Sequence, residues 1–118
     1  MQHDIGERLL RFSINVILVL RKLENSIENN VIKYQLIKSA TSVGANYEES
    51  QAGSSKLDFI NKVKILLKEM RETYYWLKIT YKTLLSNKNE KDVLELLDES
   101  EQLKKILGAI CKNASEKK

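Results

Sequence analysis

Residues 36–49 of the chain read Leu-Ile-Lys-Ser-Ala-Thr-Ser-Val-Gly-Ala-Asn-Tyr-Glu-Glu. On a helix, positions that recur at alternating steps of four and three share one face, and in a bundle Leu and Ile normally occupy that face. Here a row of polar side chains runs through the stretch and begins one residue before it, and we call this row the polar seam: Gln35, Ser39, Ser42, Asn46 and Glu49. Small residues beside the seam let a neighbouring backbone approach closely, so the stretch predicts a tightly packed helix.

The polar seam has two interpretations. We interpret it as a buried layer whose side chains bond to one another and fix the helix register, as single polar residues do in coiled coils. Alternatively, Gln35, Asn46 and Glu49 line a ligand pocket or a lumen. Both interpretations require the stretch to be helical.

Length and composition favour one helical domain. The chain has 118 residues, of which 42% are hydrophobic and 31% are charged, and this is enough for one well-filled core under a charged surface. It has no proline and only four glycines, whereas an all-β fold needs many sharp turns. We therefore expect a single all-α domain over residues 1–118.

Apolar rows at heptad spacing predict four helices, at about residues 4–24, 31–51, 55–85 and 90–113. Residues 25–30 read as the first connection, and Gly53 as the end of the second helix. Ser55 and Asn89 are the predicted N-caps of the third and fourth helices, and Asp4 that of the first. Short links between long helices predict an antiparallel up-and-down four-helix bundle.

The first helix is apolar beyond one row. Its inner row is Ile5, Leu9, Phe12, Val16, Val19 and Leu23, and the row is widened by Leu10, Ile14, Ile17 and Leu20. A helix that is apolar over so much of its circumference is expected to be covered on more than one side. Residues 12–20 are too short to span a membrane and are bracketed by Arg11 and Arg21.

The sequence holds no recognisable catalytic or metal-binding motif. There is no glycine-rich phosphate loop and no His-Glu-x-x-His, and a di-iron bundle needs Glu-x-x-His on two helices, whereas His3 is the only histidine. The single cysteine, Cys111, excludes an internal disulfide and is consistent with a reducing compartment. We expect a cytoplasmic, non-enzymatic protein with no catalytic residues, no cofactor and no metal.

The third predicted helix has an apolar face opposite its core row. This face contains Ile65, Glu72, Trp76 and Ile79. Large apolar side chains outside a core usually mark an interface, and Trp is a common anchor there. We therefore predict a homo-oligomer interface on this face. The alternative is that the first or fourth helix covers Trp76.

Positive charge is concentrated on the same helix. Residues 55–85 hold seven Lys or Arg and three acids, an excess of four that equals the net charge of the whole chain. Four of the bases recur on one edge with an aromatic ring nearby: Lys64, Arg71, Lys78 and Lys82, with Tyr75. Such an edge can hold phosphates while the ring stacks on a base. The alternative is a solvated flank.

Three segments carry a family resemblance: residues 39–49, the Ser-x-x-Asp-Phe-Ile helix start at 55–60, and Glu-x-x-Glu-x-x-Tyr-Trp-Leu at 69–77. Together they resemble the four-helix bundle proteins encoded by intervening sequences in bacterial 23S ribosomal RNA genes. The accessory variability determinant of diversity-generating retroelements is a related bundle. The resemblance implies a homopentameric barrel without enzymatic activity, and possible partners in RNA, DNA or a reverse transcriptase.

The leading expectation is thus an oligomeric, non-enzymatic bundle that binds nucleic acid or a ribonucleoprotein through the third helix. The competing expectation is a structural or protein-interaction module with no nucleic-acid role.

Overall fold

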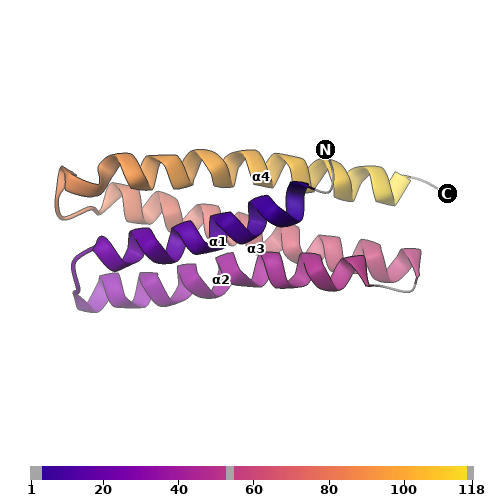
Figure 1. Cartoon of the computed structure of the whole chain (residues 1–118), viewed down its shortest axis with the longest axis horizontal. Coiled ribbons are helices and arrows are strands. Elements are labelled where there is room, and N and C mark those ends of the chain that lie inside the picture. The colour runs from indigo at the N-terminus through magenta and orange to yellow at the C-terminus, as the bar shows by residue number, and fades with distance from the viewer. Residues whose placement is uncertain (1–3, 53–54, 117–118) are drawn as a thin grey trace.

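The computed structural model describes residues 4–52 and 55–116, and all of its regular structure in those ranges is helical. The four long helices are α1 (Asp4–Lys22), α2 (Ile27–Gln51), α3 (Lys56–Lys82) and α4 (Glu90–Glu116), and a single 3-10 turn, η1 (Asn87–Asn89), precedes α4. Successive helices run in opposite directions along a rod of 50 × 23 × 20 Å (Figure 1). The predicted all-α fold with four helices is confirmed.

Helix α2 begins four residues before the predicted start at residue 31. Ser26 has an extended backbone, and its hydroxyl accepts a hydrogen bond from the Asn29 N–H at 3.0 Å, so it is the N-cap. The Asn29 side chain donates to the Glu24 carbonyl at 2.8 Å, which holds the tight turn from α1. The prediction that residues 25–30 form the connection was wrong because this cap was not recognised.

The other helix ends agree in part with the prediction. Ser55 caps α3, since its hydroxyl accepts from the Asp58 N–H at 3.0 Å. α3 ends at Lys82, earlier than predicted, and Ser86 caps η1, while the Asn89 side chain donates to the Lys22 carbonyl at 3.5 Å. Asp4 is the first helical residue of α1, and Gly53 lies outside the described residues.

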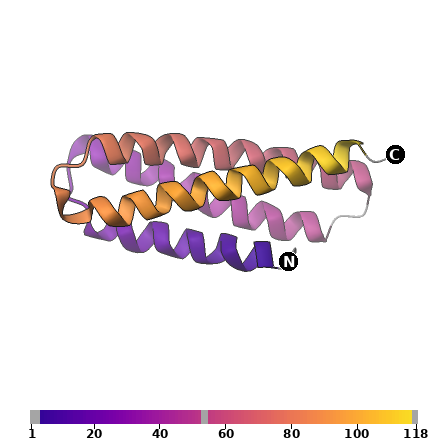
Figure 2. The same ribbon diagram turned by 90° about the horizontal axis from the view of Figure 1, so that it is seen from above.

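The four helices surround one core. α1 packs against α2 and α4, and α3 packs against the same two helices, so α1 and α3 lie diagonally across the bundle (Figure 2). The largest fully buried side chains come from all four helices: Phe12, Leu9, Leu36, Leu66, Met70, Leu77, Leu103 and Leu107. Burial of a side chain of this size stabilises the fold by about 1.5–3 kcal/mol.

α1 departs from the prediction on its outer side. Its predicted inner row is buried, and Leu20 is buried as well. Leu10 and Ile14, however, remain 55% and 46% exposed, and Ile17 is only partly buried. α1 is covered on two sides, by α2 and α4, but neither helix reaches Leu10 and Ile14, so the widened apolar row is buried only in part within a single chain.

Candidate functional site

The outward side of α3 carries one continuous row of exposed side chains, spaced four, three, four, three and four residues apart. We call it the basic row: Lys64, Lys68, Arg71, Tyr75, Lys78 and Lys82. Five of its six members are cations, and all six are exposed. At 1.5 Å per residue the row extends for roughly 27 Å along the helix. The structure thus aligns all five predicted residues on one edge.

Lys68 was missed at the sequence level. The prediction followed steps of seven residues through Lys64, Arg71 and Lys78, and Lys68 falls between them in the alternating four-three pattern. Its exposure in the structure places it in the same row. The alternating four-three spacing of the whole row is the signal in the sequence that could have identified Lys68.

Tyr75 is the aromatic member of the basic row and is 54% exposed. Its ring meets the Trp76 ring edge to face, with centroids 5.5 Å apart and planes inclined at 69°. Trp76 is itself held, because its indole N–H donates to Glu72 Oε2 at 3.3 Å and its ring packs against the core. The Tyr75 ring is therefore supported from one side while much of its surface stays open.

Two cations meet at one ring near the middle of the α3–α4 boundary. Lys78 Nζ lies 4.9 Å from the centroid of the Tyr74 ring, and Lys104 Nζ from α4 lies 4.2 Å from the same centroid. Lys104 also forms an ion pair with Glu101 at 3.1 Å. Periodicity within one helix could not reveal Lys104, because only the packing of α4 on α3 brings it to Lys78.

The predicted interface face of α3 is only partly open. Ile65 is 45% exposed, whereas Glu72, Trp76 and Ile79 are half-buried. Trp76 packs against the core of its own chain, as the alternative interpretation anticipated in part. This face offers less apolar surface to a partner than its sequence indicated.

The polar seam does not form one buried layer. Ser39 is buried, and its hydroxyl lies 2.8 Å from the Thr73 hydroxyl of α3. Half-buried Asn46 donates to the Ser42 carbonyl and hydroxyl of the same helix, at 2.9 and 3.0 Å. Gln35 is half-buried, and exposed Glu49 forms an ion pair with Lys62 at 3.5 Å. One member bonds across helices inside the core, and the others lie toward the surface.

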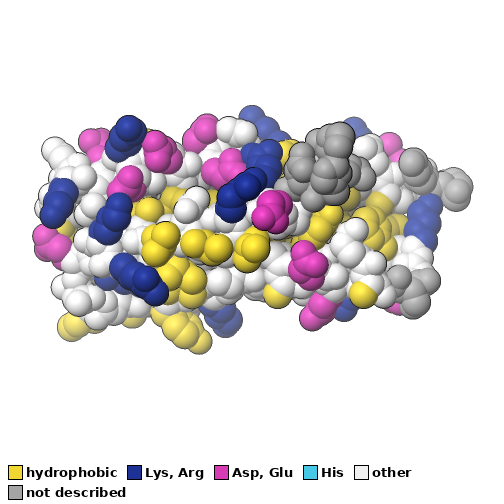
Figure 3. Space-filling view, viewed as in Figure 1, with side chains coloured by type: hydrophobic (Ala, Val, Ile, Leu, Met, Phe, Trp, Pro, Cys, Tyr) yellow, Lys and Arg dark blue, Asp and Glu magenta, His cyan; other side chains and the backbone are white. Residues whose placement is uncertain are grey.

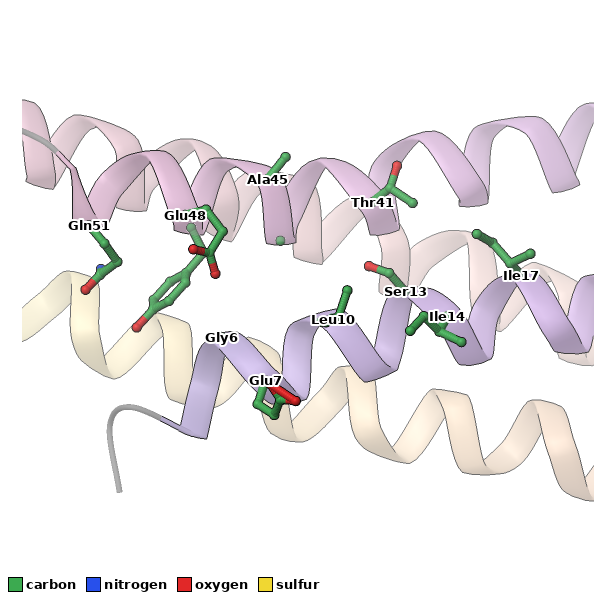
Figure 4. Close-up of a pocket in the computed structure, with 12 residues that line it drawn as sticks. Gly6, Glu7, Leu10, Ser13, Ile14, Ile17, Thr41, Ala45, Glu48 and Gln51 are labelled. Atoms are coloured by element: carbon green, nitrogen blue, oxygen red, sulfur yellow. The ribbon is translucent and has the colours of Figure 1, made fainter.

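A groove runs between α1 and α2, with a volume of about 810 Å³ (Figure 4). Leu10 and Ile17 line its α1 side, and Thr41 and Ala45 line its α2 side. At one end, burial and then the charge of Glu48 raise the pKa of the Tyr47 hydroxyl above its ordinary value. The groove is therefore apolar along its middle and acidic at one end.

The remaining candidate sites, for a metal ion or a reactive cysteine, were also compared with the structure. Within residues 4–52 and 55–116, no three His, Cys, Asp or Glu side chains are grouped so that they could hold a metal ion. Cys111 is half-buried, and His3 lies outside the described residues. In the same ranges, none of the helices combines the length and apolar character that crossing a membrane requires.

These features define the class of protein to which the chain belongs, an antiparallel four-helix bundle with a row of exposed cations on one helix. A family model described as 23S rRNA-intervening sequence protein matches residues 1–109, and the chain belongs to this family. The resemblance read from the three sequence segments is thereby confirmed.

A solved structure supports the same assignment. It is a protein with unknown function from the S23 ribosomal protein family of Bacteroides thetaiotaomicron VPI-5482, and it is 31% identical to this chain. The alignment has a TM-score of 0.80 and covers 92% of this chain and 98% of that one. None of the curated proteins compared with the chain matches it.

Proposed function

We propose that the chain is a non-enzymatic, oligomeric bundle of the cytoplasm that binds nucleic acid, or a ribonucleoprotein, through the basic row of α3. The observation that carries the proposal is the row itself, in which five exposed cations and one exposed ring share one edge. Phosphates are held by such cations without regard to sequence, and an open ring can stack on any base.

Charge distribution supports the same surface. α3 holds seven basic and three acidic residues, and two of the acids are directed elsewhere. Glu72 accepts a hydrogen bond from Trp76, and Glu69 is half-buried, so neither belongs to the exposed row. Lys104 lies beside Lys78, but its own charge is offset by the ion pair with Glu101. The charged side chains of the basic row itself are all positive.

Assembly strengthens the proposal. A homopentamer, which the family resemblance implies, repeats the basic row in each subunit, so one nucleic acid can contact several rows at once. Each weak contact then benefits from the high effective concentration of the next. The partner can be bare RNA or DNA, or a reverse transcriptase bound to its nucleic acid.

The test is binding of a fluorescent single-stranded RNA and a DNA duplex, measured by anisotropy over a range of salt concentrations. Replacing Lys64, Arg71 and Lys78 together by Gln is expected to weaken binding about tenfold or more and to flatten the salt dependence by roughly two to three units of slope. Light scattering on the same variant should show unchanged assembly.

A matched control removes equal charge from another helix. Lys91, Lys105 and Lys112 are exposed on α4 and recur on its outward side, with no aromatic ring among them. Their joint replacement by Gln should reduce affinity much less than the α3 variant does. Equal losses of affinity in both variants would show that binding depends on the overall positive charge of the protein and not on its position on α3. If the wild-type protein binds neither nucleic acid at low salt, the protein-interaction function replaces this one.

A further inference from the structure

Tyr75 interrupts the cations of the basic row near its middle. The cations nearest to it in the row are Arg71, four residues before it, and Lys78, three residues after it. These two positions are about 10 Å apart along the helix at 1.5 Å per residue, whereas the other neighbouring cations of the row are about 4.5–6 Å apart. The row therefore has space at its centre for a flat group between two phosphates.

Neighbouring rings hold this centre in place. The Tyr75 ring meets the Trp76 ring edge to face, with 5.5 Å between centroids, yet it stays 54% exposed. Lys78 Nζ lies 4.9 Å from the centroid of the Tyr74 ring, and this contact keeps the ammonium close to the helix. Side chains that are already ordered lose less freedom when a ligand binds. Tyr75 and Lys78 are therefore arranged for binding before the ligand arrives.

Two acids near this centre have partners of their own. Glu72, three residues before Tyr75, is half-buried and accepts a hydrogen bond from the indole N–H of Trp76 at 3.3 Å. Glu101 of α4 pairs with Lys104 at 3.1 Å. On the face of the bundle where α1 lies in front, by contrast, basic and acidic side chains are intermixed around an apolar centre (Figure 3). A strand of phosphates therefore meets an unmixed row of cations on α3 and not on that face.

A nucleobase is the flat group that carries a phosphate on either side of its nucleotide. In a duplex both faces of each base are covered by stacked neighbours, and an aromatic side chain reaches a base only by forcing two of them apart. In a single strand the unstacked bases are open, and stacking on an aromatic ring strengthens binding about fivefold or more for each base. Phosphate contacts alone favour the duplex instead, because its two strands carry a denser charge.

We infer that the basic row binds a single-stranded polynucleotide, RNA or DNA, in preference to a duplex, and that Tyr75 is the residue that determines this choice. One unpaired base stacks on the Tyr75 ring, and Arg71 and Lys78 hold the phosphates on its two sides. The inference rests on the proposed function and names the form of nucleic acid that its site binds. Each chain carries a complete site, so a homopentamer presents the same site once in every subunit.

The test compares four labelled ligands of equal length by anisotropy at one low salt concentration: oligouridine, oligothymidine, an RNA duplex and a DNA duplex. Wild type is expected to bind the single strands more tightly than either duplex. Tyr75→Leu should weaken single-strand binding about fivefold or more and change duplex binding less than about twofold, because the cations remain and only the stacked base is lost. The tighter of the two single strands shows whether the site prefers RNA or DNA.

Two variants and one further ligand are the controls. Tyr75→Phe keeps the ring and should bind single strands within about twofold of wild type. Tyr34→Leu removes a tyrosine that is 64% exposed on α2, outside the basic row, and should change neither affinity. An oligodeoxynucleotide made only of abasic residues keeps its phosphates, so wild type should bind it about as weakly as Tyr75→Leu binds oligothymidine. This last comparison needs no variant of the binding site for its wild-type arm.

Any of three results would overturn the inference. Wild type could bind a duplex as tightly as the single strands, Tyr75→Leu could weaken both forms equally, or the abasic strand could bind as tightly as oligothymidine. Each of these leaves nucleic-acid binding by the α3 cations standing, because the joint replacement of Lys64, Arg71 and Lys78 measures that binding separately. If wild type binds none of the four ligands, the proposed function itself fails, and this inference fails with it.

Discussion

The hydroxyl groups of Ser39 and Thr73 lie 2.8 Å apart in the core between α2 and α3. Thr73 Oγ1 is also 2.8 Å from the Glu69 carbonyl oxygen, and Ser39 Oγ is 3.3 Å from the Leu36 carbonyl oxygen. Each hydroxyl has one proton, so one donates to the other and the second donates to its own helix. Two buried polar groups are thus satisfied together.

This pair makes a quantitative prediction. Ser39→Ala should lower the free energy of unfolding by about 0.5–1.5 kcal/mol, because Thr73 loses its partner in the core. Adding Thr73→Val should cost less than the sum of the two single changes, since replacing both partners leaves no stranded group. Urea denaturation of the four proteins gives the coupling energy. Strictly additive effects would mean that the two hydroxyls do not interact.

The polar seam shows what periodicity reveals and what it does not. Helical spacing correctly placed Ser39 toward a neighbouring helix, but it gave Asn46 and Glu49 the same role. In the structure, Asn46 bonds to Ser42 on its own helix, and Glu49 is exposed. The spacing of a row fixes a common side only approximately, and the neighbouring helices decide how much of that side they cover.

Whether a side chain is exposed or covered depends more strongly on helix packing than the positions of the helices do. Four helices and the basic row follow from spacing and charge within single helices. Other features depend instead on how the helices lie against one another. These are the partial burial of Trp76 against the core, the exposure of Leu10, and the contact of Lys104 with the Tyr74 ring. No pattern within one helix contains that information.

Gly108 gives a simple stability prediction. It lies inside α4 with a negative φ, and a Cβ added there would meet nothing within 4 Å. Gly108→Ala should therefore raise the free energy of unfolding by about 0.5–1 kcal/mol, because alanine loses less backbone freedom on folding. Thermal unfolding followed by circular dichroism should show a midpoint higher by roughly 2–6 °C. A lower midpoint would mean that this side of α4 is closely packed in the assembly.

Lys104 connects two interactions that respond differently to pH. Its ammonium lies over the Tyr74 ring of α3 and pairs with Glu101 of its own helix at 3.1 Å. The hydrogen bond from Lys104 is the main cause that lowers the pKa of Glu101 below its ordinary value, 4.5, and attraction to Lys104 and Lys105 adds to it. The ring contact involves no carboxylate.

The stabilisation that comes from Glu101 is therefore complete above the ordinary pKa of 4.5 and is lost as the pH falls through the lower pKa of the folded state. Lys104→Met removes both the ion pair and the ring contact, so it should lower stability at about pH 7 by more than it does at about pH 3. The loss that persists in acid measures the contact with Tyr74. Urea midpoints of wild type and variant across this range provide the comparison, and in a Glu101→Gln background the Lys104→Met change should show only the loss that is independent of pH. A gap between wild type and Lys104→Met that stays constant from neutral to acidic pH would show that the Glu101 pair contributes nothing.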